Sequence, residues 1–337
     1  MTVVAFLGPR GTNSEEAALM YAGPEAELRP YAGFPALTAA VERGEADVAV
    51  LPVENSIEGP VSAALDLLIH GTTLKLCHEV VVPIRHVLVG GEGARLEGIR
   101  SVMSHPQALA QCRGWLERHL PDAEQVAWLS TGGAVQAVVE GDDPTVAAIG
   151  PERAYQLYGG VVLARDIQDV RSNLTRFMVM AHEDAEPTGD DKTFIALTCN
   201  ANVPGSLHAV LGPFARAGVQ LTNVITRPTK GWLGEYIFLL DFEGHRKDEK
   251  IARVLDEVRA IADEVKVMGS CPRFPVERYR DLIAAPTTAE DGNANAQTAR
   301  DRGWAARPGA SSAADRQCTA GQGDPGSSID VPGTKRR

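Results

Sequence analysis

Short apolar runs and amphipathic helical segments alternate along the first 180 residues, and this alternation decides the fold class. The runs have the length of buried strands, whereas the segments between them carry apolar residues at helical spacing. Such a pattern is typical of α/β architectures with largely parallel sheets. The expected strands are Val3 to Leu7, Val48 to Val53, Ile99 to Met103, Gln125 to Leu129, Val146 to Ile149 and Phe177 to Ala181.

A long extended run, Leu74 to Val89, divides this α/β part. It is too continuous for one compact strand–helix unit, so we expect it to cross between lobes, with a return near residues 160 to 175. Residues 1–182 would then form two lobes, one of 1–75 with 160–182 and one of 76–159, with a cleft between them. The expected helices are Glu15 to Tyr21, Pro35 to Arg43, Val61 to Ile69, Gln107 to Leu120, Gly133 to Glu140 and Pro151 to Tyr158.

The pattern changes after a polar linker at residues 183–192. Residues 193–275 have the order strand, helix, strand, strand, helix, strand, which predicts a ferredoxin-like α+β domain. Pro213 lies inside the first of these helices, where a proline is expected to bend the backbone. Residues 284–337 contain almost no aliphatic side chains, so we expect a disordered tail.

The composition excludes several classes of protein. A net charge of −11 and a pI near 5.3 argue against a nucleic-acid partner. No apolar stretch approaches the roughly 20 residues of a membrane span, and the N-terminus carries no secretory signal. The 5 cysteines have no paired spacing, which favours free thiols. We therefore expect a cytoplasmic protein.

Motifs for metals and nucleotides are also lacking. His, Cys, Asp and Glu do not recur at ligand spacings in residues 1–182, and there is neither a Walker loop nor a GxGxxG motif. We expect no metal and no cofactor. His105 is expected to be mainly structural, and His86 is a candidate neighbour of the site.

Three helix starts carry hydroxyl side chains, at Thr12, Ser104 and the pair Ser130–Thr131. Capping is the ordinary role of such residues, but helix N-termini also offer free amides and a partial positive charge to anions. The run Asn173-Leu174-Thr175-Arg176-Phe177 adds a hydroxyl beside a guanidinium that can grip a carboxylate. Together these features indicate a site for a dicarboxylate.

Asn55 and Ser56 follow the strand Val48 to Val53, at the sheet edge where open α/β folds bind ligands. They can serve as turn and cap residues or contact the substrate. The run Pro52-Val53-Glu54-Asn55-Ser56, together with Gly8-Pro9-Arg10-Gly11-Thr12, Ser104-His105-Pro106-Gln107 and the Thr175-Arg176-Phe177 motif, resembles prephenate dehydratase. The resemblance covers residues 3–275 and includes an ACT regulatory domain at 193–275.

The resemblance implies a two-lobed, periplasmic-binding-protein-like catalytic part and a cofactor-free reaction. Prephenate would lose its ring hydroxyl and ring carboxylate to give phenylpyruvate, carbon dioxide and water. Thr175 would donate to the leaving hydroxyl and Arg176 would hold a carboxylate. The other substrate-binding residues expected from the motifs are Asn55, Ser56, Asn173, Phe177, Thr12, Ser104, Ser130 and Thr131.

The resemblance also implies an effector, phenylalanine, bound between paired regulatory domains of a homodimer or homotetramer. The expected effector residues are Gly205, Ser206, Leu207, Thr226, Arg227 and Pro228.

The chain departs from the family pattern at several positions. Asn13 replaces an aromatic residue, Gly132 and Gly133 replace bulkier residues, and Ile225-Thr226 replaces Glu-Ser. Two other functions remain open, a dehydratase for arogenate, the aminated analogue, and a ligand sensor without enzymatic activity.

Overall fold

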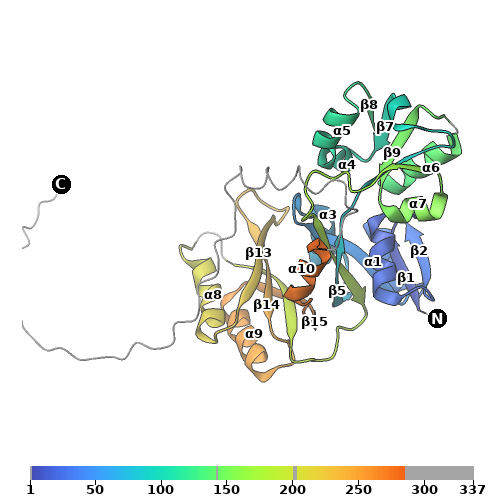
Figure 1. Ribbon diagram of the computed structural model, residues 1–337. Coiled ribbons are helices and arrows are strands. Elements are labelled where there is room, and N and C mark those ends of the chain that lie inside the picture. Colours follow the sequence, from blue (N-terminus) through green and yellow to red (C-terminus); the bar gives the residue numbers. More distant parts are fainter. Residues whose placement is uncertain (1, 142, 200–202, 285–337) are drawn as a thin grey trace, which may run out of the picture. The chain divides into compact units, whose positions relative to one another are not determined.

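The computed structural model describes residues 2–141, 143–199 and 203–284 (Figure 1). The first lobe is built on a 6-stranded sheet in the order β2-β1-β3-β11-β5, with β4 paired to β3. Its strands are β1 (Val3–Leu7), β2 (Glu27–Tyr31), β3 (Val48–Asn55), β4 (Gly59–Pro60), β5 (Lys75–Pro83) and β11 (Leu174–Ala181). Its helices are α1 (Asn13–Ala22), α2 (Phe34–Glu42), α3 (Ser62–Asp66) and the π-helix η1 (Leu67–Gly71).

The second lobe has a 5-stranded sheet in the order β10-β6-β9-β7-β8. The strands are β6 (Val87–Gly90), β7 (Ser101–Ser104), β8 (Glu124–Ala127), β9 (Val146–Gly150) and β10 (Val161–Ala164). The helices are the 3-10 helix η2 (Leu96–Gly98), α4 (Pro106–Gln111), α5 (Arg113–His119), α6 (Thr131–Gly141) and α7 (Glu152–Tyr158). The two-lobed α/β class expected for this part is therefore confirmed.

The boundary between the lobes differs from the expectation. The run Leu74 to Val89 forms two strands, and β5 belongs to the first sheet because it pairs with β11 along its whole length. The chain thus crosses after Pro83 rather than at residue 75. It returns between Ala164 and Leu174, within the range expected for the return, although β10 (Val161–Ala164), which was expected in the first lobe, belongs to the second. Both sheets are also mixed instead of largely parallel, because β11 and β6 run antiparallel to their neighbours.

Local differences have identifiable causes. The helix expected at Gln107 to Leu120 is divided into α4 and α5 at Cys112, whose backbone (φ −110°, ψ 8°) is not helical. Strand β2 was not expected because its sequence, ELRPY, lacks an apolar pattern and contains Pro30. Proline is tolerated there because β2 is the edge strand of its sheet.

The third sheet has the order β13-β14-β12-β15, the ferredoxin-like topology predicted for this region. Pro213 lies inside α8, as expected. Helix α10 was not predicted, and the expected disordered tail lies outside the described residues from 285 onward. The elements are β12 (Asp191–Thr198), α8 (Ser206–Arg216), β13 (Leu221–Pro228), β14 (Tyr236–Glu243), α9 (Glu249–Ile261), β15 (Glu264–Pro272) and α10 (Val276–Ala284).

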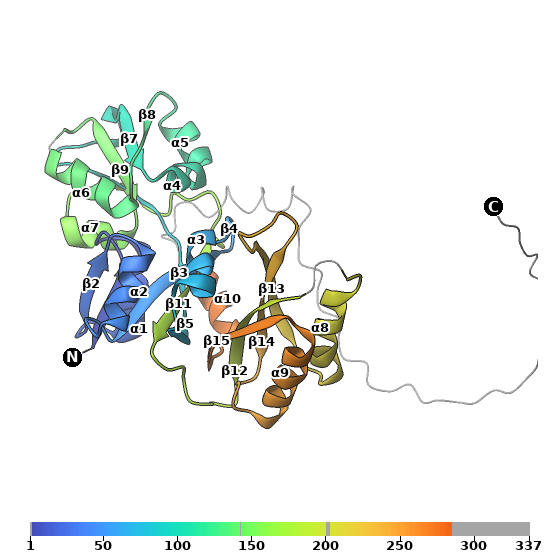
Figure 2. The same ribbon diagram turned by 180° about the vertical axis from the view of Figure 1, so that it is seen from behind.

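The third sheet has an apolar core on each face. Helices α8 and α9 cover one face (Figures 1 and 2). On this face Phe214 packs on Phe242. Side chains of the other face, including Phe194 and Leu239, share a single core with side chains of the first lobe, including Met178. At Gly269 (φ +142°), an added Cβ would stand only 2.5 Å from the carbonyl oxygen of Leu76 on β5. Backbone therefore meets backbone where β15 passes β5.

Candidate active site

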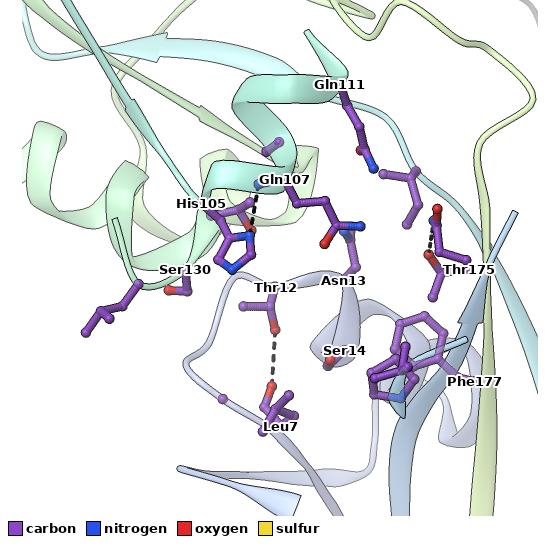
Figure 3. Close-up of a pocket in the computed structure, with 18 of the residues that line it drawn as sticks. Leu7, Thr12, Asn13, Ser14, His105, Gln107, Gln111, Ser130, Thr175 and Phe177 are labelled. Atoms are coloured by element: carbon purple, nitrogen blue, oxygen red, sulfur yellow. Dashed lines mark hydrogen bonds between the residues drawn. The ribbon is translucent and has the colours of Figure 1, made fainter. Parts of the chain in front are cut away.

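A cavity of about 410 Å³ lies between side chains of the two lobes (Figure 3). The first lobe contributes the loop after β1, the start of α1 and the ends of β3 and β11. The second lobe contributes α4 and the start of α6. The polar lining residues are Thr12, Asn13, Ser14, Asn55, His86, His105, Gln107, Gln111, Ser130, Thr131 and Thr175.

Thr175 and Asn55 form a hydrogen-bonded pair across β11 and β3. The Oδ1 atom of Asn55 accepts from the backbone amides of Ile57 and Glu58, each at 3.0 Å. This fixes the amide orientation, so Nδ2 of Asn55 donates to Oγ1 of Thr175 at 2.9 Å. Because the threonine oxygen already accepts this bond, the hydroxyl proton of Thr175 remains for a ligand in the cavity.

The same logic orients the amides behind this pair. Nδ2 of Asn55 also donates to Oδ1 of Asn173 at 2.7 Å, and Nδ2 of Asn173 donates to Oε1 of Gln111 at 3.0 Å. That oxygen lies 3.0 Å from Nε2 of His86, which must therefore carry the proton. The Nδ1 atom of His86 is left as an acceptor without a partner among the described residues. Burial lowers the pKa of His86, although its bond to Gln111 opposes the shift, so the ring is neutral at pH 7.

The described lining contains no Arg, Lys, Asp or Glu side chain. Positive potential comes instead from helix N-termini, since the first amides of a helix have no helical acceptor. Thr12 does not cap α1, because its hydroxyl donates to the carbonyl oxygen of Pro9 at 3.1 Å. At α6, Ser130 Oγ accepts from the amide of Gly133 at 3.0 Å. The starts of α1 and α6 therefore suit the carboxylates of an anionic ligand.

Contacts between the lobes hold this cavity in shape. Glu15 of α1 accepts from Arg153 of α7 at 2.9 Å and from the amide of Gly11 at 2.5 Å. Burial acts to raise the pKa of Glu15, but these hydrogen bonds and the charges of Arg153 and Arg10 hold it below its usual value. A Cβ at Gly132 would stand 2.5 Å from the carbonyl oxygen of Arg10. The glycine that departs from the family pattern thus permits close approach of the lobes.

Comparison with known proteins decides the family. The prephenate dehydratase model matches residues 4–185 and the ACT domain model matches residues 193–260. The chain belongs to the prephenate dehydratase family. The prephenate dehydratase of Amycolatopsis methanolica is 40% identical over 276 residues, which are 81% of this chain and 89% of the relative.

Two solved structures are similar over most of the chain. The prephenate dehydratase of Arthrobacter aurescens, solved in complex with L-Phe, has a TM-score of 0.75 and 34% identity and covers 90% of this chain and 98% of its own. GqqA, described as a novel type of quorum quenching acylase, has a TM-score of 0.74 and 32% identity and covers 82% of this chain and 100% of its own. The fold is therefore shared by proteins with different described activities.

The family motifs supply much of the cavity. Thr12, Asn55, Ser130, Thr131, Thr175 and Phe177, all expected at the site, line it. Asn173 lies fully buried behind Asn55 and orients it. Ser56 and Ser104 do not line the cavity. Ser56 Oγ donates to the carbonyl oxygen of Ser172, and Ser104 Oγ donates to that of Ile149. Both hydroxyl groups therefore stabilise the backbone rather than contact a ligand.

Arg176 is the main correction to the sequence-based site. Side chains alternate along a strand, so Arg176 lies on the face of β11 opposite Thr175 and does not line the cavity. Its Nη1 lies 2.8 Å from Oδ2 of Asp241 on β14, and its Nη2 lies 2.9 Å from Oε2 of Glu54. With these carboxylates around it, the guanidinium is not placed to hold a substrate carboxylate.

The expected effector residues lie on two elements of the ACT domain. Gly205 precedes α8 with φ +84°, and a Cβ there would meet nothing within 4 Å. Its glycine requirement is thus conformational rather than one of close approach within the chain. Ser206 and Leu207 begin α8. Thr226 and Pro228 are exposed on the edge strand β13, whereas Arg227 turns inward and bonds Asp66 of α3 at 3.0 Å.

Four polar residues that line the cavity were not predicted from the sequence, namely Gln107, Gln111, Asn13 and Ser14. One signal was present, because Gln107 and Gln111 are one helical turn apart and share a face of the expected helix. That face lies away from the apolar stripe containing Leu109 and Cys112. His105 was expected to be structural; its Nδ1 accepts from the amide of Gln107, yet its ring also lines the cavity.

No group of three or more His, Cys, Asp or Glu side chains among the described residues is arranged to hold a metal ion. None of the helices in the same residues is long and apolar enough to cross a membrane.

Proposed function

We propose that this protein carries out the decarboxylating dehydration of prephenate to phenylpyruvate, carbon dioxide and water in L-phenylalanine biosynthesis, within the cavity between its lobes. Membership of the prephenate dehydratase family supports the reaction. The observation that carries the assignment of the site is the hydrogen bond from Asn55 Nδ2 to Thr175 Oγ1, which leaves the threonine proton unused.

The reaction needs this proton at one point. As the ring carboxylate leaves as carbon dioxide, its bonding electrons enter the ring and hydroxide departs from the opposite carbon. Aromatisation drives the step, and the hydroxide leaves as water when a proton reaches it. Thr175 would donate a hydrogen bond to this oxygen, and Gln111 has an amide group directed to the same cavity. Neither residue is a strong acid, so positioning of the substrate contributes much of the rate.

The carboxylates would bind at the starts of α1 and α6, with Arg176 taking no part. Amides of a helix N-terminus bind anions without a side-chain cation. The absence of Asp and Glu from the described lining favours prephenate over arogenate, since an ammonium group would call for a carboxylate partner.

An acylase activity like that described for GqqA is less well supported. Acyl transfer by a serine or threonine uses a hydroxyl bonded to a general base. Among the described residues, His86 Nε2 bonds Gln111 and His105 Nδ1 bonds the amide of Gln107, and neither bonds a hydroxyl. A non-enzymatic sensor would have no need for the oriented proton of Thr175.

The test is phenylpyruvate formation from prephenate by the wild type, Thr175→Ala and a control, Thr222→Ala, at an exposed position of β13. We expect Thr175→Ala to lose about 10²–10³ in kcat with little change in folding. The control should match the wild type. Turnover by folded Thr175→Ala at the wild-type rate would refute this role for the threonine. Arogenate and an acyl amide, offered separately, test the alternatives.

Regulation and assembly complete the proposal. The ACT domain and the L-Phe complex of the Arthrobacter relative support phenylalanine as the effector. Exposed Trp232, Leu233 and Val224, on and beside edge strand β13, support a homodimer or homotetramer formed through this domain. The biosynthetic role of the family supports a cytoplasmic location. Titration with L-phenylalanine, followed by activity and light scattering, would measure inhibition and size together.

A further inference from the structure

On the face of the ACT sheet that packs on the first lobe, the two central strands, β14 and β12, each carry one nearly buried charged side chain among apolar ones. Asp241 follows Ile237 and Leu239 on this face of β14, and Lys192 precedes Phe194 on the same face of β12. Asp241 is 6% exposed and Lys192 is 8% exposed. Charges are costly to bury in such surroundings unless they are paired. Both must therefore find partners on the catalytic sheet.

The catalytic sheet supplies these partners from β11 and β5. Arg176 Nη1 lies 2.8 Å from Asp241 Oδ2 and 3.5 Å from Glu79 Oε1. Lys192 Nζ lies 3.4 Å from Glu79 Oε2. Burial raises the pKa of Asp241, and the charge of Arg176 opposes this shift. Burial acts to lower the pKa of Arg176, but the surrounding carboxylates raise it above its usual value. The guanidinium thus stays charged.

Arg176 also reaches the strand that carries Asn55. In the register of β11 on β3, Thr175 stands opposite Asn55 and Arg176 stands opposite Glu54. The first pair bonds on the cavity face, and the second pair bonds on the ACT face with Arg176 Nη2 2.9 Å from Glu54 Oε2. The register shifts after Arg176, at a bulge that lets Asn55 and Pro52 both line the cavity. Two neighbouring residue pairs of β11 and β3, Thr175 with Asn55 and Arg176 with Glu54, thus lie on opposite faces of the sheet.

We propose that Asp241 of the ACT domain is a positioning residue for the catalytic pair Thr175 and Asn55. Asp241 holds Arg176, and Arg176 together with Glu54 fixes β11 on β3 one residue away from the reacting hydroxyl. The proposal rests on the proposed function in taking Thr175 as the donor to the substrate.

The position of Asp241 also connects the effector region with the site. Strand β14 lies between β13, which carries the expected effector residues Thr226 to Pro228, and β12. A ligand that shifts β14 would move Asp241 against Arg176 and so disturb the rung next to Thr175. An effector acts only through a difference between two states, and this ion pair is a contact whose geometry such a shift would change.

The experiment compares Asp241→Asn, Asp241→Glu and a control, Asp256→Asn, in the full chain. Asp256 is an exposed residue of α9 paired only with Arg259 among described contacts. We expect Asp241→Asn to lower kcat about tenfold, since small displacements of a catalytic group are costly. KM should stay within about twofold, because the lining is unchanged. Inhibition by phenylalanine should weaken. Asp241→Glu, which keeps the charge, should retain more activity than Asp241→Asn.

A second readout separates this proposal from the assigned reaction. Amide hydrogen exchange of residues 48–55 and 174–181 should accelerate in Asp241→Asn and not in Asp256→Asn. If the wild type makes no phenylpyruvate, the proposed function fails, and exchange in these strands still decides the role of Asp241. If Asp241→Asn does not fold, Asp241→Glu decides it, because its longer side chain should displace Arg176 and lower kcat about threefold, and wild-type kcat in this variant would overturn the proposal. Unchanged kcat, inhibition and exchange in the folded Asp241 variants would overturn the proposal.

Discussion

The two faces of strands β3 and β11 differ sharply in chemistry. The cavity face presents amides, hydroxyls and apolar groups, with no charged side chain in the described lining. The opposite face carries Arg176 and Glu54, which join the more deeply buried Glu79, Lys192 and Asp241 in an ionic cluster. Arg176, which holds this cluster together, is therefore the next residue after Thr175, yet its side chain lies on the other side of the sheet.

The Thr175-Arg176-Phe177 motif therefore combines two roles, one at the cavity and one at the contact with the ACT domain. The charges hold the catalytic sheet against the ACT sheet, where water is excluded and ion pairs must be complete. The cavity face leaves the substrate's carboxylates to helix ends and its hydroxyl to a neutral donor. A charged residue that neighbours a catalytic residue in sequence can therefore be assigned to the substrate only when it is known which face of the strand it lies on.

Loss of Arg176 should have the largest effect and tests whether its face is structural. Arg176→Gln leaves the buried Asp241 without its ion-pair partner and leaves Glu79 with Lys192 alone, so we expect a loss of about 3–5 kcal/mol in unfolding free energy. KM for prephenate should change little. Arg216→Gln, at an exposed pair with Glu257, should cost no more than about 1 kcal/mol. Denaturant unfolding and initial rates measure both. If KM rises and stability is unchanged, Arg176 binds the substrate and our structural assignment is wrong.

Reversal of the Asn55 bond tests the cavity face. In Asn55→Asp the new carboxylate oxygen accepts from Thr175, so the threonine proton turns away from the substrate. We expect a loss of about 10²–10³ in kcat. Thr175→Ser, which keeps the hydroxyl and the bond from Asn55, should lose far less. Steady-state kinetics provides the measurement, and full turnover by Asn55→Asp would show that the direction of this bond is irrelevant.

The pH dependence of stability should show the smallest effect. Burial lowers the pKa of His86 in the folded protein. The unfolded chain therefore binds a proton at His86 below the ordinary histidine pKa of 6.5, at a pH where the folded protein does not yet bind it. The contribution of His86 is full above that value and is lost as pH falls toward the lower folded pKa, by at most about 1.4 kcal/mol per pH unit. His86→Gln should flatten this slope. If the free energy of unfolding in urea has the same pH slope in both proteins, the pKa of His86 is the same in the folded and the unfolded chain.

The sequence predicted the fold class because its signals are local. Alternating apolar runs and helical spacing specify β1, β3 and β9 without knowledge of distant partners, and the second half repeats its pattern clearly enough to specify the ferredoxin-like order. The lobe boundary failed because an unbroken extended run does not show where one strand ends and the next begins. Only the pairing of β5 with β11 reveals it.

The site was predictable where a residue acts through its own position in a motif. Thr175, Asn55 and Ser130 lie at strand or helix ends, and such ends gather at the cavity. Arg176 could not be placed, because its partner Asp241 is 65 residues away and belongs to another domain. Gln111 was missed because the orientation of its amide depends on bonds to Asn173 and His86 that no local pattern encodes.

The core shared by the catalytic and ACT sheets limits how such enzymes can be recombined. An ACT domain transplanted from a relative would have to present apolar groups like those of Phe194 and Leu239, an acid at the position of Asp241, and a residue without a side chain where Gly269 touches Leu76. A transplanted domain that lacked any of these would expose apolar surface of the catalytic sheet to solvent or leave Arg176 without its carboxylate partner. The two domains are therefore expected to be inherited as one unit, and sensitivity to new effectors should be sought in the exposed strand β13 rather than by exchange of the whole domain.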